Sequence, residues 1–461
     1  MAESAEPFVH EHWKSRGAFL MACVGSAIGL GTIWRFPYIT GVNGGGAFVL
    51  IYAACVLIIG IPLVAAEIAL GRRGGNSAIR SMQKLATEEG ASRFWVLLGW
   101  LSVLTPFVGL MLYSVIGGWV IDYAIQSGRG MFAGADAESS SAFFATLTSN
   151  PWRLLFWHTV FISITIGIVA RGVNAGIARA VELLIPGLAV LLVVLLVYVL
   201  FTTDFMSGVR FLFQPDFGKV NATVVLMAIG QAFFSLSIAV GALITYGAYM
   251  PKRISIPGAA CTIAVADTSV AILIGLVVFP LVITYGLEPG EGPGLVFVTL
   301  PIAFGSMPGG AFFGTVFFVL MLMTALTSSI GMLEPVVSRL VESRRMGRPA
   351  LAVIIGGIAW LCGLMAVLSF NVLSGFNPLS WIPGFETSTL FDLLDFTAAN
   401  LLIPAGGLLI ALFAGWVMRR ESIRDELGLR DGVVFRLWYA LVRYVLPVAI
   451  LIIAGTNLLG R

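Results

Sequence analysis

The chain contains few charged residues. Of its 461 residues, only 11% are Asp, Glu, Lys or Arg, whereas 58% are hydrophobic. No soluble fold could bury that much apolar surface, because the outside of a soluble domain needs charged and polar side chains. The shortage of charge therefore excludes a soluble globular protein, gives no reason to expect a nucleic-acid partner, and predicts an all-α polytopic membrane protein in a lipid bilayer.

Cysteine and histidine are also scarce, with four and three copies. The cysteines, Cys23, Cys55, Cys261 and Cys362, fall singly in apolar segments without paired or metal-like spacing, so we predict ordinary thiols. Among these few residues the sequence shows neither a nucleophile with a neighbouring base nor a metal cluster. We therefore predict that the protein is not an enzyme.

Long apolar runs, in contrast, are abundant. Each is close to or above the ~20 residues that a helix needs to cross a bilayer. They predict eleven membrane-spanning helices, at residues 16–40, 43–70, 94–125, 152–170, 176–201, 222–249, 255–285, 310–341, 350–369, 389–417 and 435–459. The Pro- and Gly-rich loop at 286–309 is expected to form a short external helix.

Lys and Arg are concentrated in alternate loops of this arrangement, for example in 72–93, 339–348 and 419–436. Positively charged loops tend to stay on the cytoplasmic side of a membrane. We therefore expect a multi-pass protein of a cell inner membrane or plasma membrane, with a cytoplasmic N-terminus and an external C-terminus.

The first apolar run is interrupted by the stretch GSAIGLGTIWRFPY at 25–38. Gly25, Gly29 and Gly31 each weaken a helix by about 1 kcal/mol relative to Ala. Pro37 then removes a backbone donor. The pattern predicts a broken helix, and irregular backbone at membrane depth is tolerated only where protein or a water-filled cavity satisfies it, often at an ion site.

This stretch and the Asn-Gly-Gly-Gly-Ala-Phe that follows it at 43–48 closely resemble the first two membrane helices of the neurotransmitter:sodium symporters. The resemblance extends from His10 to about Leu458. It implies a sodium-coupled symporter that imports an amino acid by alternating access. A membrane receptor or sensor that binds an amino acid without transport is the alternative.

The family's fold is an inverted repeat of five helices plus five, with discontinuous first and sixth helices and an eleventh helix. Here this implies a single transporter domain over 1–461, with repeats at about 16–201 and 222–417 and the extra helix at about 435–459. The second break is expected between Gly230 and Gly241. Glu67, an acid inside the second span, is predicted to accept hydrogen bonds from amides that the breaks set free.

The family pattern also implies a substrate site between the two breaks. Helix-end amides near Ser26 and the Tyr113 hydroxyl would receive the substrate carboxylate, and carbonyls near Phe234 would receive its amino group. The predicted substrate-binding residues are Ser26, Ala27, Gly31, Gly109, Tyr113, Phe234, Ser235, Ser237, Val240, Ser328, Ser329 and Met332. Small Gly109 and adaptable Met332 predict a roomy pocket for apolar or aromatic L-amino acids.

Two sodium ions are implied in addition, each held by oxygen atoms, the ligands that hard cations prefer. Site two would use carbonyls of Gly25, Ile28 and Thr324 and the side chains of Thr327 and Ser328. Site one would use Ala27, Thr32, Ser235 and Asp267.

Site one departs from the family pattern, which usually has Asn at the positions of Thr32 and Asp267. Ala271 stands where chloride-dependent relatives carry Ser, although Tyr52 and Gln231 of the chloride site remain. An ionised Asp267 would repel a nearby chloride in a medium of low dielectric. We predict that Asp267 binds sodium and that chloride is not required; the alternative is a protonated Asp267 in a structural hydrogen-bond network.

The resemblance finally implies two gates. Arg35 and Asp395 would close the external side. On the cytoplasmic side, His10 stands where the family usually has Arg, ahead of Trp13, and would face Tyr249 and Glu342.

Overall fold

The structure, a computed structural model, describes residues 11–287, 294–342 and 346–459. Every regular element within these residues is helical. His10, one of the predicted gate residues, and part of the 286–309 loop lie outside them. The rest of that loop forms η6, a π-helical segment over Leu295–Thr299, and α14 over Leu300–Gly305, so the predicted short helix is present.

The apolar runs fold into the predicted helices. The first span is bent by 54° between Arg16–Ala27 and Gly31–Val42, and the sixth is divided into two short helices. In chain order the spans consist of α1 (Arg16–Ala27), η1 (Gly31–Arg35) and α2 (Phe36–Val42); α3 (Gly46–Cys55), η2 (Val56–Gly60) and α4 (Ile61–Gly74); α6 (Val96–Gly128); α8 (Pro151–Val169); η4 (Val173–Ala178) and α9 (Arg179–Thr202); α11 (Ala222–Ser235) and α12 (Ala242–Ala248); α13 (Ile256–Thr284); α15 (Gly310–Val341); α16 (Arg348–Leu368); α17 (Leu390–Phe396), η7 (Thr397–Leu402), α18 (Ile403–Leu412) and η8 (Phe413–Val417); and α20 (Val433–Ala440), η9 (Leu441–Val445) and α21 (Leu446–Leu459).

Shorter helices connect the spans. They are α5 (Ala78–Glu88), η3 (Arg93–Trp95), α7 (Ala137–Ser149), α10 (Phe205–Phe213), η5 (Phe217–Lys219) and α19 (Arg420–Leu427). The hydropathy pattern did not reveal these helices, because they are too short or too polar to span a bilayer. Of these connecting helices, α5 and α19 lie at the end of the bundle that carries Arg73, Arg80, Arg339 and Arg419, called the Arg-rich end below.

Local sequence fixes where several helices begin. The Ser15 hydroxyl accepts a hydrogen bond from the Ala18 amide at 3.0 Å, and the Asn221 side chain accepts one from Val224 at 3.0 Å. These caps satisfy backbone donors that the first turn of a helix leaves without partners. They define the starts of α1 and α11, the two helices that lead into the breaks.

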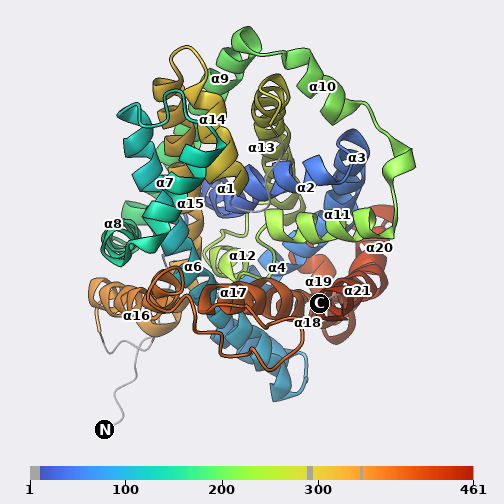
Figure 1. Ribbon diagram of the computed structural model, residues 1–461. Helices are drawn as coiled ribbons and strands as arrows, with labels where there is room; N and C mark the ends of the chain where they lie inside the picture. Colours follow the sequence, from blue (N-terminus) through green and yellow to red (C-terminus); the bar gives the residue numbers. More distant parts are fainter. Residues whose placement is uncertain (1–10, 288–293, 343–345, 460–461) are drawn as a thin grey trace.

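The broken helices lie inside the bundle. In Figure 1, α1, α2 and α12 occupy the middle of the molecule and the other helices surround them. In the apolar 18-residue stretch of the span over Gly310–Val341, 83% of the residues are buried, compared with 28% in that of Val173–Thr202. Thus α15 is a central wall of the structure, whereas α9 presents most of its apolar side chains outward, as a lipid-facing helix does.

Candidate substrate and sodium-binding site

The two helix breaks face each other. Helix α1 ends at Ala27, and Ile28 is extended with ψ 94°. In the sixth span Ser237 and Ala239 have positive φ angles of 49° and 62°, which side-chain-bearing residues rarely adopt and which are found at functional sites. The Ser237 hydroxyl donates to the Ser26 carbonyl at 2.9 Å and so joins one break to the other.

Glu67 supports the second break. The residue is fully buried, and its Oε2 accepts a hydrogen bond from the Ala239 amide at 3.0 Å. This amide belongs to the unwound segment, where it has no helical carbonyl to bond. The predicted role of Glu67 is confirmed at this amide.

Glycine allows the close approach of backbone in both breaks. A Cβ on Gly31 would lie 2.4 Å from the Phe234 ring, and a Cβ on Gly241 would lie 1.9 Å from the Ser102 carbonyl oxygen. Pro106 cannot donate to that carbonyl as a residue four positions along a helix normally would. The sixth span therefore packs directly against a carbonyl that a proline has left without its helical partner.

A cavity of about 80 Å³ lies beside the breaks. It includes seven predicted substrate-binding residues, namely Gly31, Gly109, Tyr113, Phe234, Ser237, Val240 and Met332. Further lining comes from Leu30, Trp34, Thr105, Leu112, Ile116, Phe233, Ile238, Asp395, Ala398, Ala399 and Ile403. Most of these side chains are apolar, so the cavity suits a hydrophobic side chain.

Other predicted substrate residues lie next to the cavity rather than on its wall. Ser26 is buried and carries the carbonyl that Ser237 contacts. The Ser329 hydroxyl lies 2.8 Å from that of Thr165 on α8. Ser328 lies against Ile28, and Ser235 belongs to the cluster around Asp267.

Asp267 on α13 is fully buried and gathers hydroxyl groups from three other spans. Thr32 donates to its Oδ1 at 2.8 Å, and Ser235 donates to its Oδ2 at 2.5 Å. Tyr52 donates to the same Oδ2 at 3.3 Å, and Gln231 donates to the Gly31 carbonyl at 3.1 Å. Of the predicted site-one residues, Thr32, Ser235 and Asp267 are thus in contact, and Ala27 ends α1 at the break.

The predicted site-two residues also meet. The Ser328 hydroxyl lies 3.5 Å from the Ile28 carbonyl oxygen. A Cβ on Gly25 would be 3.1 Å from the Thr327 Cβ, so these two segments are in contact. The Thr327 hydroxyl donates to the Thr324 carbonyl at 3.0 Å. Carbonyl and hydroxyl oxygens of α1 and α15 therefore converge, as a hard cation requires.

On one side of the cavity, the Arg35 guanidinium lies over the Phe234 ring, 4.5 Å from its centroid. Such a cation–π contact is favourable in a site sheltered from water. Asp395, which lines the cavity, is close enough to interact electrostatically with Arg35. The structure therefore brings together the two predicted residues of the outer gate.

At the opposite side, Trp13 is buried, and its backbone amide donates to the Tyr249 carbonyl at 3.1 Å. The Tyr249 hydroxyl donates to Glu334 at 2.8 Å, and Arg348 forms an ion pair with the other oxygen of Glu334. Neither Glu334 nor Arg348 is among the residues predicted for the inner gate. A signal was present, because an acid inside a membrane helix is a functional candidate by default.

Glu342, the remaining residue predicted for the inner gate, has partners of its own. It accepts hydrogen bonds of 2.5 Å from the Ser77 amide and hydroxyl, and its carboxylate lies 3.4 Å from Arg80 and 3.7 Å from Arg339. Its predicted contact with His10 involves a residue outside the described part of the chain. The three described partners all lie near the Arg-rich end of the bundle.

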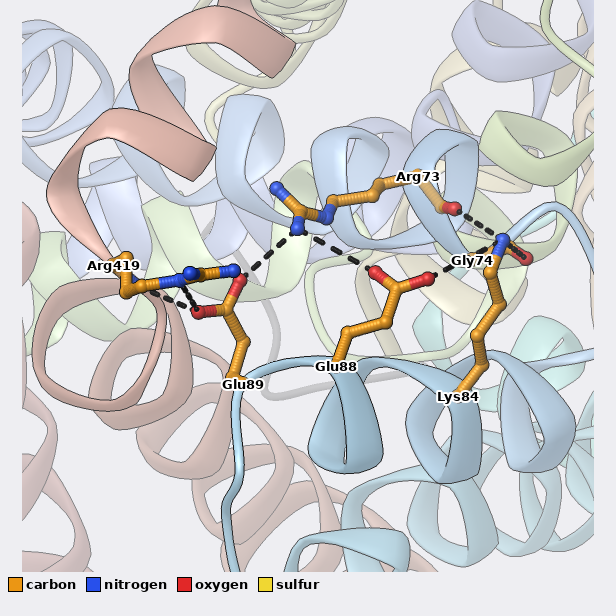
Figure 2. A network of polar contacts seen from close by, with 6 residues as sticks. All are labelled: Arg73, Gly74, Lys84, Glu88, Glu89 and Arg419. Atoms are coloured by element: carbon orange, nitrogen blue, oxygen red, sulfur yellow. Dashed lines mark hydrogen bonds and ion pairs between the residues drawn. The ribbon is translucent and has the colours of Figure 1, made fainter.

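A second polar network lies at this end and is shown in Figure 2. Glu89, whose side chain is fully buried, forms ion pairs with Arg73 at 3.1 Å and with Arg419 at 2.9 Å. Burial by itself would raise the pKa of Glu89, but hydrogen bonds from Arg419 and Ser422 and the charge of Arg73 outweigh it and lower the pKa. The network joins α4, the end of α5 and the segment before α19.

Comparison with known proteins agrees with this geometry. A solved structure, that of MhsT in complex with L-phenylalanine, has a TM-score of 0.87 and 41% sequence identity, covering 97% of this chain and all of that one (100%). The sodium-dependent transporter YhdH of Bacillus subtilis is 38% identical over 451 residues, 97% of each chain. A sodium-dependent transporter of Haemophilus influenzae is 32% identical over 453 residues, covering 97% of this chain and 98% of its own.

These likenesses confirm the predicted fold class, an all-α membrane protein with an inverted five-plus-five repeat, discontinuous first and sixth helices and an extra helix. The model of the sodium:neurotransmitter symporter family matches residues 10–142 and 144–459, nearly the whole chain. With two broken helices meeting at a buried cavity and oxygen clusters formed by residues at the breaks, the chain belongs to the sodium:neurotransmitter symporter family and is a multi-pass, sodium-dependent transporter, not an enzyme.

Proposed function

We propose that this transporter imports apolar or aromatic L-amino acids together with two sodium ions and does not require chloride. The observation that carries the proposal is the apolar cavity between the two helix breaks. At the breaks, backbone amides and carbonyls without helical partners are available to the two charged ends of an amino acid. The similar MhsT structure, which holds L-phenylalanine, supports the same class of substrate.

The two clusters of oxygen atoms would couple substrate import to the entry of sodium. Site two would bind sodium with Gly25, Ile28, Thr324, Thr327 and Ser328, and site one with Ala27, Thr32, Ser235 and Asp267. Each sodium charge that moves inward releases about 2.3 kcal/mol per 100 mV of membrane potential. Two ions would therefore sustain roughly three decades of substrate accumulation, at about 1.4 kcal/mol per decade.

Chloride independence is supported by the surroundings of Asp267. A carboxylate that accepts hydrogen bonds from Thr32, Ser235 and Tyr52 already provides the negative charge beside site one. Ala271, on the same helix, is buried and has no group that could bind an anion. A chloride placed here would face an ionised carboxylate at low dielectric, which is unfavourable.

The test is uptake of labelled L-phenylalanine into proteoliposomes with an inward sodium gradient. We expect uptake to stop when potassium replaces sodium and to persist when gluconate replaces chloride. Asp267→Asn should raise the sodium concentration for half-maximal uptake by tenfold or more, because a neutral amide attracts a cation less strongly.

One result would contradict chloride independence, and another would contradict transport. Strict chloride dependence of the wild-type protein would refute the assigned role of Asp267 while leaving the symporter intact. Sodium-dependent binding of L-phenylalanine without any accumulation would favour a receptor or sensor. Thr262→Ala is a suitable control, because Thr262 lies on the same helix but is exposed, and its hydroxyl donates to the Gly258 carbonyl at 2.8 Å, away from Asp267.

A further inference from the structure

One buried hydroxyl in the cavity wall, that of Thr105, has no hydrogen-bond partner among the residues that the structure describes. Thr105 on α6 is 2% exposed and lines the cavity, and its Oγ1 makes no hydrogen bond to any described residue. Threonine inside a helix usually bonds to a carbonyl of the preceding turn, as the Thr165 and Thr159 hydroxyls on α8 do. A buried hydroxyl without a partner is costly, so its position at a binding cavity needs an explanation.

Thr105 lies on the cavity-facing side of α6. Thr105, Gly109 and Tyr113 are four residues apart, so they lie one above another on one face of the helix. Thr105 is about 12 Å along the helix axis from Tyr113, given eight residues at 1.5 Å each. If the substrate carboxylate is near Tyr113, Thr105 stands at the far end of the side-chain pocket.

The residues between these two positions form an apolar passage whose width depends on Met332. Gly109 has no side chain, and Met332 packs so closely over it that an added Cβ would lie 3.3 Å from the Met332 sulfur. Met332 and Val240 contribute apolar walls from α15 and the sixth span. Because methionine is flexible, a shift of the Met332 side chain would let a ring extend past Gly109 toward Thr105, whereas a short aliphatic side chain would end before it.

We propose that Thr105 is a specificity-determining residue that hydrogen-bonds a distal hydroxyl on an aromatic substrate, so that the preferred substrates are aromatic amino acids with a para-hydroxyl group, such as L-tyrosine. The inference rests on the proposed amino-acid symport and names its substrate more narrowly. The physical reason is that a ligand without the hydroxyl, such as L-phenylalanine, would leave the Thr105 hydroxyl buried without a hydrogen bond. A ligand with the hydroxyl would satisfy it.

The test compares L-tyrosine with L-phenylalanine, which differ by one oxygen atom. Equilibrium binding of both to the purified protein is measured in saturating sodium. We expect L-tyrosine to bind about five- to tenfold more tightly to the wild type, as one neutral hydrogen bond provides. Thr105→Val, which keeps the shape, should bring the ratio to about one, and Thr105→Ser should restore the preference for L-tyrosine.

A matched control is available one turn earlier on the same helix. Ser102 is also buried, but its hydroxyl donates to the Leu98 carbonyl at 2.9 Å and the residue does not line the cavity. Ser102→Ala should therefore keep the wild-type ratio. Because the readout is a ratio of two ligands on one protein, a general loss of folded protein does not change it.

Each alternative result has one meaning. Equal affinities in the wild type, or an unchanged ratio in Thr105→Val, would overturn the role of Thr105. If sodium-dependent uptake of L-phenylalanine is intact in that case, the proposed symport stands and only this inference fails. If neither aromatic amino acid binds in sodium, the proposed substrate class and this inference both fail.

Discussion

At the scale of single residues, Gly241 occupies a position that fits no other amino acid. Its φ angle of +84° is unfavourable for residues with a side chain, and a Cβ there would lie 1.9 Å from the Ser102 carbonyl oxygen. Gly230, in the same interrupted span, has open space around its Cα, with no atom within 4 Å of an added Cβ. The two glycines therefore have different physical reasons for being present.

We predict opposite effects of alanine at these two positions. Gly241→Ala should destabilise the protein by about 2–5 kcal/mol, because it combines backbone strain with an overlap that cannot relax easily. Gly230→Ala should be neutral or stabilise by up to about 1 kcal/mol, since alanine favours the helix. Thermal melting in detergent measures both. Equal melting temperatures for the two variants would show that the close contact with Ser102 is not maintained.

At the scale of elements, the Arg-rich end is held together by the buried Glu89. Its carboxylate links Arg73 at the end of the second span to Arg419 beside α19, while Glu88 next to it is 39% exposed and pairs with Arg73 at 3.4 Å (Figure 2). A second contact supports the same junction, since Arg72 pairs with Glu426 of α19 at 2.5 Å. Exposed pairs contribute little, whereas breaking a buried one leaves charge without compensation.

We predict that Glu89→Gln lowers the melting temperature at neutral pH and that Glu88→Gln, its matched control, scarcely does. The pKa of Glu89 in the folded protein lies below the ordinary value of 4.5. A carboxyl whose pKa is depressed by folding stabilises the protein above its unfolded-state pKa, and this stabilisation is lost as the pH falls through the folded-state value. The difference between wild type and Glu89→Gln should thus be largest near pH 7 and shrink below pH 4.5.

A constant difference from pH 7 down to pH 3.5 would contradict the ionised network, since it would mean that the glutamine disturbs packing instead. Labelling of a cysteine introduced at the exposed Glu421 of α19, in a background with Cys261→Ser, gives a second readout. Faster labelling in Glu89→Gln than in Glu88→Gln is expected if Glu89 holds α19 against α5.

At the scale of the whole molecule, charged pairs lie on both sides of the break in the first span. Arg35 and Asp395 lie on one side, and Glu334 with Arg348 lies on the other. Alternating access requires that these two closures do not open together, so each pair should act as a unit. In the proposed transport cycle, one ion pair separates while the other ion pair stays formed.

We predict that Arg35→Ala and Asp395→Ala each reduce sodium-driven uptake of L-phenylalanine at least tenfold while the protein remains folded. The double variant should be scarcely worse than either single one, because removing the second member of a pair loses little once the first is gone. A double-mutant cycle on uptake rates in proteoliposomes measures this. Losses that simply multiply would show that Arg35 and Asp395 work independently. Arg93→Ala serves as the control, because Arg93 is an exposed arginine in η3.

The sequence by itself determined the architecture. Hydropathy located the spans because crossing a bilayer is a local requirement of length and apolarity. Gly25, Gly29 and Gly31 predicted the first break because their effect on a helix is also local. The motif around them placed the chain in its family, and the candidate residues at 25–32 and 324–328 came with it.

Only the tertiary structure decided which polar groups are in contact. Ser329 faces Thr165 of α8, Glu334 pairs with Arg348, and Glu89 pairs with Arg419, which lies 330 positions away in the sequence. Thr105 is the opposite case, a hydroxyl that packing leaves without a hydrogen-bond partner in the described part of the chain. Hydropathy records how apolar a helix is, but the direction of each side chain and its neighbour depend on how distant helices pack, so no local pattern could reveal these pairs.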